Sequence, residues 1–162
     1  MTEVHESMKD LEFLIGRWQG TGTGLLSNGP SFQYTEELII ENIGQPNFAY
    51  SASSCIGGKT RHRESGFIKC HEDNKVVFCI AENLGSCSIL LGALQTNSNE
   101  KKLHLTSDSI CRSPFNKEPY VVKSAREYLF DGEKLHLIVR IATTKNTELT
   151  DHLKITYERK SV

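Results

Sequence analysis

The chain has 162 residues, with 19 basic and 20 acidic side chains, and its net charge of -1 provides no positive field for binding nucleic acid or an anionic membrane. The five cysteines are odd in number and contain no C-x-x-C, which argues against a disulfide framework and a zinc ribbon. The sequence shows no apolar targeting or membrane-spanning run. We therefore expect one domain over residues 1–162, located in the cytoplasm, with a nuclear location left open.

The first predicted element is a short helix at about residues 7 to 15. Residues 7–10, SMKD, have the spacing of a capping box, and apolar residues follow at helical spacing as far as Ile15. Gly16 is expected to end this helix.

The next segment, GRWQGTGTG at residues 16–24, predicts a strand with one nearly bare face. Read with a period of two, Trp18, Gly20, Gly22 and Gly24 share one face, and polar side chains occupy the other. Glycines in alternation indicate either a sharply bent backbone or a bulky group packed closely against the strand. A nucleotide-binding loop is disfavoured, because neither G-x-G-x-x-G nor G-K-[ST] occurs in the chain.

Short extended runs separated by turn residues continue to the end of the sequence, which is typical of an antiparallel sandwich or barrel. The runs cover residues 16–24, 31–41, 48–55, 60–70, 75–82, 87–95, 102–110, 120–130, 134–143 and 149–160. Asp131-Gly132 is the strongest hairpin signal, and residues 113–119 form the one longer connection. We expect an all-β fold: a ten-stranded antiparallel up-and-down barrel like those of fatty-acid-binding proteins and lipocalins, with the N-terminal helix over one end and an internal cavity.

Histidines are the main candidates for chemistry. His62 and Glu64 lie two residues apart on one strand face, where they form either an acid-base pair or a surface salt link. His104 and His136 alternate with leucines and are expected to point outward. His152 has no second histidine at i+2 or i+4, which disfavours a zinc site.

Several segments, in their order along the chain, resemble the nitrobindin family. They are GRWQGTGTG at 16–24, FQYTEE at 32–37, GQP at 44–46, HRESGFIK at 62–69, NKVVF at 74–78, KEP at 117–119 and HLKITYERK at 152–160. The resemblance spans nearly the whole chain and is closest to the haem domain at the C-terminus of the animal THAP-domain proteins.

The resemblance implies a barrel that holds noncovalent haem b with ferric iron bound by His152. It places His62 on the distal side, where it either donates a hydrogen bond to a bound oxyanion or shapes the pocket. Asn28 stands at the position of a family threonine near the haem, Arg61 at a usually apolar position, and Glu82 at the position of a pocket glutamine.

The implied function is binding of nitric oxide and isomerisation of peroxynitrite to nitrate, with no nucleic-acid or membrane partner. The alternative is an intracellular carrier of an apolar ligand such as a fatty acid, which the barrel pattern also suits.

Alternation in the last strand sets a geometric condition on His152. Leu153, Ile155 and Tyr157 fall on the face opposite to His152. If the apolar face is the inner one, His152 enters the cavity only where a turn or bulge resets the register.

Overall fold

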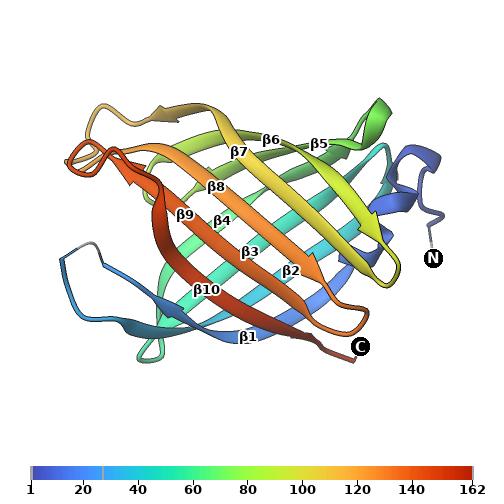
Figure 1. The fold of residues 1–162 in the computed structure, drawn as a ribbon, viewed down its shortest axis with the longest axis horizontal. Helices are drawn as coiled ribbons and strands as arrows, with labels where there is room; N and C mark the ends of the chain where they lie inside the picture. The colour runs from blue at the N-terminus through green and yellow to red at the C-terminus, as the bar shows by residue number, and fades with distance from the viewer. Residues whose placement is uncertain (1, 27, 162) are drawn as a thin grey trace.

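A computed structural model describes residues 2–26 and 28–161, and within this part of the chain the strands form one closed antiparallel barrel (Figure 1). The strands are β1 (Gly16–Gly24), β2 (Phe32–Gln45), β3 (Asn47–Ile56), β4 (Lys59–Cys70), β5 (Lys75–Glu82), β6 (Ser86–Asn97), β7 (Glu100–Arg112), β8 (Val121–Phe130), β9 (Leu135–Thr143) and β10 (Thr150–Arg159). Each strand pairs with its neighbours in sequence, and β10 pairs with β1 to close the barrel. The predicted ten-stranded up-and-down barrel is therefore confirmed for the described residues.

The predicted strand limits agree with the observed ones to within a few residues. The runs at 16–24 and 75–82 coincide with β1 and β5, and the largest difference is at β2, which continues to Gln45. Residues 113–119 form the predicted longer connection, here between β7 and β8. No helix in the described ranges is both long enough and apolar enough to cross a membrane.

The N-terminal helix exists but differs in kind from the prediction. It is a 3-10 helix, η1 (Glu6–Leu14), and its buried side chains Met8, Leu11 and Leu14 recur every three residues, which is the period of a 3-10 helix. The capping-box interpretation was wrong, because the cap is His5, whose ring accepts a hydrogen bond from the backbone N–H of Ser7.

Helix η1 closes one end of the barrel, where Trp18 forms the floor. The Trp18 side chain is fully buried, and its indole N–H donates to the Leu14 carbonyl oxygen at 2.9 Å. The Arg159 guanidinium lies 4.1 Å from the centroid of the Trp18 ring and donates to the carbonyls of Phe13 and Ile15. The end of β10 and η1 thus lie at the same end of the barrel, so the start of β10 lies at the other (Figure 1).

The bare face of β1 is an inner face packed against larger neighbours. At Gly22 and Gly24 an added Cβ would lie only 2.6 Å and 2.0 Å from the rings of Tyr34 and Phe32 on β2. At Gly20 it would lie 2.2 Å from the backbone carbonyl oxygen of Thr156 on β10. The glycines therefore allow two aromatic rings and a neighbouring strand to approach β1 closely, which is the second of the two alternatives that the sequence left open.

Gly20→Ala is expected to lower the free energy of unfolding by about 1–3 kcal/mol, because the new methyl group meets backbone that can move only by distorting the β1–β10 pairing. Urea unfolding would measure the change. Thr21→Ala, at the exposed neighbouring position, is the control and should stay within about 0.5 kcal/mol of the parent. Equal midpoints for the parent and Gly20→Ala would contradict this explanation of the glycine.

Candidate functional site

The end of the barrel opposite η1 contains a cavity of about 690 Å³, which is within the range of about 300–1,000 Å³ common for small-molecule sites. Apolar and aromatic side chains from several strands make up much of its wall, including Phe32, Tyr34, Val139 and Ile141. Both His62 and His152 line it as well. A second hollow of about 770 Å³, over the outer faces of β1, β2, β3 and β10, is lined by polar groups, glycine and one cysteine, without histidine or aromatic residues.

A β-bulge in β10 gives His152 access to the cavity. Asp151 pairs with Arg140 and Leu153 pairs with Val139, so His152 is an extra residue without a partner on β9. As a result His152 and Leu153, although adjacent in sequence, both line the cavity. The sequence required a turn or bulge for His152 to enter the cavity, and this bulge meets that requirement.

A backbone carbonyl fixes which His152 nitrogen is free. His152 Nδ1 lies 3.1 Å from the carbonyl oxygen of Leu25, and the Leu25 N–H donates to the His152 carbonyl at 2.7 Å. Since a carbonyl can only accept, Nδ1 carries the hydrogen, and the neutral ring keeps its lone pair on Nε2. Histidines that bind metals usually donate their second ring N–H to such a partner, so this ring could bind the iron of a haem through Nε2.

His62 lies on the other side of the cavity from His152. In the closed barrel β1, β2 and β3 separate β4 from β10 on one side, and β5 to β9 separate them on the other. A second bulge, between the pairs Ser54–His62 and Cys55–Thr60, makes Arg61 an extra residue of β4, and both Arg61 and His62 line the cavity. The two histidines therefore stand on roughly opposite walls.

Asn28 is not part of this arrangement. It is exposed in the connection between β1 and β2, and it is not among the residues that line the cavity. His104 and His136 point away from the core between buried leucines, as the alternation predicted.

Beneath His62 lies a buried ion pair that sequence reasoning missed. Arg126 on β8 donates to both oxygens of Glu64, Nη1 to Oε1 at 2.6 Å and Nη2 to Oε2 at 2.9 Å, and the Tyr50 hydroxyl also donates to Oε1. Glu64 and Arg126 are 7% and 9% exposed, so the His62–Glu64 pair is not a surface salt link. The sequence did contain a sign that Arg126 points inward, because Arg126 is two residues from Tyr128 and therefore lies on the same inner face of the strand.

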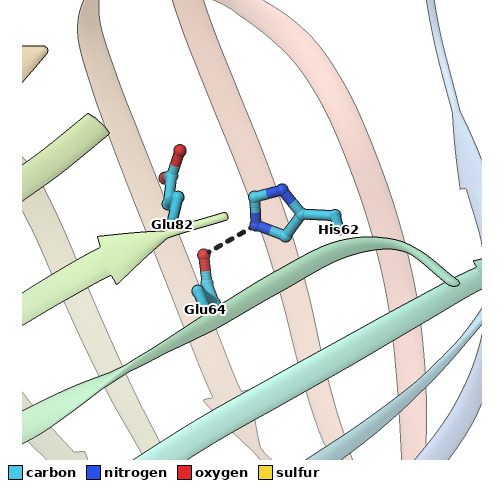
Figure 2. A group of neighbouring side chains, drawn as sticks. All are labelled: His62, Glu64 and Glu82. Atoms are coloured by element: carbon cyan, nitrogen blue, oxygen red, sulfur yellow. Dashed lines mark hydrogen bonds and ion pairs between the residues drawn. The ribbon is translucent and has the colours of Figure 1, made fainter. Parts of the chain in front are cut away.

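The pair orients the His62 ring. Burial alone would raise the pKa of Glu64, but the charge of Arg126 and the hydrogen bonds from His62, Arg126 and Tyr50 hold that pKa well below its usual range. Because the carboxylate is ionised and can only accept, His62 Nε2 is the donor in their 3.1 Å hydrogen bond, shown in Figure 2. His62 Nδ1 is then the ring nitrogen left for a ligand.

The charge state of His62 depends on two carboxylates. Burial lowers its pKa, but the hydrogen bond and charge of Glu64, followed by the charge of Glu82, outweigh burial and raise it. Glu82 lies beside the pair (Figure 2). It accepts a hydrogen bond from the Ser86 hydroxyl at 2.8 Å. The raised pKa increases the fraction of imidazolium near neutral pH, in which Nδ1 also donates.

The same three groups could in principle hold a metal ion, since ligand atoms of His62, Glu64 and Glu82 lie within 4.8 Å of one another. The oxygens of Glu64, however, already accept hydrogen bonds from Arg126, Tyr50 and His62. A cation there would displace these donors and face the Arg126 charge, so we interpret the cluster as a hydrogen-bond network.

A closed barrel with one covered end and a mixed apolar and polar cavity at the other defines a small-molecule-binding β-barrel. Residues 7–159 match the family described as the THAP4-like, heme-binding beta-barrel domain, and the chain belongs to this family. It is therefore a haem-binding barrel domain by family.

Among curated relatives, the chain is 36% identical over 163 aligned residues to peroxynitrite isomerase THAP4 of Rattus norvegicus, covering 97% of this chain and 28% of that protein. It is 34% identical to peroxynitrite isomerase Rv2717c of Arabidopsis thaliana, covering 93% of this chain and 87% of that protein. The crystal structure of Rv2717c from M. tuberculosis superposes with a TM-score of 0.91 at 26% identity, covering 98% of this chain and all of the other.

Glu82→Gln is expected to lower the pKa of His62, because the charge of Glu82 is one of the interactions that raise it. An NMR titration of the ligand-free protein would follow the His62 ring. Glu100→Gln, at an exposed position at the other end of the barrel, should leave the His62 midpoint unchanged. A His62 midpoint that is the same in both variants and the parent would contradict the role given to Glu82.

The raised His62 pKa also has a consequence for stability. The folded chain binds this proton more tightly than the unfolded chain, so the stabilisation is complete below the unfolded value of about 6.5 and is lost as pH rises through the folded pKa.

Arg126→Met is expected to lower the free energy of unfolding by about 3–5 kcal/mol, because it leaves the Glu64 charge buried without its partner. The double variant Glu64→Gln/Arg126→Met removes both charges and should recover most of that loss. Denaturant unfolding of the parent, Glu64→Gln, Arg126→Met and the double variant measures the coupling energy between the two side chains. If the two single losses simply add in the double variant, the pair is not coupled and this account is wrong.

Proposed function

We propose that this chain is a haem-dependent peroxynitrite isomerase that also binds nitric oxide, with noncovalent haem b in the ferric state and His152 as its protein ligand. The observation that carries the proposal is the His152 ring on the cavity wall, with Nδ1 on the Leu25 carbonyl and Nε2 free. The named activity of the relatives supports it, together with membership of a haem-binding family.

The residues of the cavity suit the cofactor. A largely apolar wall accepts a porphyrin face, and the volume is that of a small-molecule site. His152 would hold the iron, and, when bound, a ferric haem supplies an iron with an open coordination position for small oxyanions or nitric oxide. Family membership favours this occupant over the fatty-acid-like ligand of the alternative prediction.

His62 would act from the cavity wall opposite His152. Glu64 accepts a hydrogen bond from the Nε2–H of His62 and is itself held by Arg126 and Tyr50, so the ring is fixed with Nδ1 available. In the imidazolium form, Nδ1 donates a hydrogen bond to an oxyanion, and it can hold or release a proton there.

Asn28 is exposed and lies outside the cavity wall, so no haem contact is proposed for it in this conformation. The single domain over residues 1–162 and the cytoplasmic location remain predictions from the sequence.

Hemin titration of the purified chain is expected to produce the Soret band of bound haem, and His152→Ala should abolish it because the iron loses its protein ligand. The matched control is His104→Ala, which removes an exposed histidine on the outer face and should leave the band unchanged. Stopped-flow measurements should show peroxynitrite decay that accelerates in proportion to haem content.

A haem-loaded parent that leaves the decay rate unchanged would remove the enzymatic part of the proposal. A protein that rejects hemin and co-purifies with lipid would instead support the carrier.

A further inference from the structure

Charge is distributed unevenly along the wall of the cavity. The exposed charged residues that line it, Arg61, Arg112 and Lys117, are all basic. The carboxylates that line it, Glu36, Glu64 and Glu82, are all buried or half-buried. The mouth of the cavity is therefore positive, while negative charge lies deeper.

Two of these cations are available for a ligand. Within the described ranges, neither Arg61 nor Lys117 has an ion-pair partner, whereas Arg112 donates to the Val121 carbonyl at 2.6 Å and lies over the ring of Tyr120. Arg61 lines the cavity because it is the extra residue of the β4 bulge. Without the bulge, alternation would put it on the outer face next to the inward-facing His62.

Large apolar side chains accompany the cations at the mouth. Leu84 and Phe115 line the same cavity and are 62% and 88% exposed. The connections that carry them are joined by hydrogen bonds, from the Ser113 N–H to the Gly85 carbonyl at 2.8 Å and from the Asn116 amide to the same carbonyl at 3.4 Å. A ligand that covers these side chains and also contacts Arg61 and Lys117 must have an apolar body and an anionic edge.

Haem has this chemistry, since its porphyrin is apolar and it carries two carboxylate side chains. Deep in the cavity those carboxylates would lose their hydration and approach the ionised Glu64. At the mouth they keep water and meet unpaired cations. We propose that Arg61 and Lys117 bind the carboxylates of the cofactor, a role that rests on the proposed function of the same cavity.

Comparing hemin with its dimethyl ester, in which both carboxylates are neutral, tests this site directly. The parent protein should bind hemin more tightly than the ester, as measured by Soret titration and by the rate of transfer to apomyoglobin. In Arg61→Met/Lys117→Met this preference should fall by about five- to tenfold, since each exposed ion pair contributes about two- to fivefold. Higher ionic strength should reduce the parent's preference in the same direction.

The matched control is Arg63→Met/Lys69→Met, which removes the same charges from exposed positions of β4 that do not line the cavity and should keep the full preference. A parent that takes up hemin and the ester equally well would overturn the carboxylate site while leaving the proposed function intact. A parent that takes up neither would overturn the proposed function and this site with it. If the cavity variant keeps the full preference and slows only peroxynitrite decay, the cations act on the anionic substrate and the proposal is wrong.

Discussion

The site depends on the strict two-residue alternation of β-strands and on the bulges that interrupt it. In β10, alternation sends Leu153, Ile155 and Tyr157 inward, so an uninterrupted strand would turn His152 to solvent. One extra residue lets His152 and Leu153 share the cavity wall and places the histidine ring beside the Leu25 carbonyl. The bulge at Arg61 in β4 likewise lets two residues that are adjacent in sequence, Arg61 and His62, line the facing wall. Each bulge near the open end thus adds one polar side chain to the cavity wall, His152 on β10 and Arg61 on β4.

The second constraint is the cost of placing charge inside this barrel. Glu64 is tolerated because Arg126 pairs with it through two hydrogen bonds and Tyr50 adds a third. The same arrangement determines which nitrogen of His62 carries a hydrogen. The ion pair that stabilises the buried charge of Glu64 therefore also defines the hydrogen-bonding direction of His62. A second carboxylate on the inner face, Glu36, is half-buried and has no cation partner in the described part of the chain: burial raises its pKa, and the Tyr157 hydroxyl donates a hydrogen bond to it.

The two ends of the barrel serve different purposes. At the η1 end, Trp18 and the helix side chains Met8, Leu11 and Leu14 are fully buried, and Arg159 covers the tryptophan ring, so this end is closed. At the other end, long connections and exposed side chains such as Phe115 surround an opening with basic residues. The closed end stabilises the fold, and the open end remains free to admit a cofactor and small ligands.

The sequence by itself determined the barrel, because period-two patterns and turn residues are local signals, and β1 and β5 were predicted residue for residue. It also placed Trp18 and the glycines on one face and identified His62, Glu64 and His152 as candidates. Only the tertiary structure decided that Arg126, 62 residues from Glu64 along the chain, completes the ion pair. The 3-10 geometry of η1 and the exposed position of Asn28 also came only from the structure. The physical reason is that a bulge depends on the register between two paired strands, and a cross-barrel contact joins strands that are distant in sequence. No local pattern of one strand encodes its partner's position.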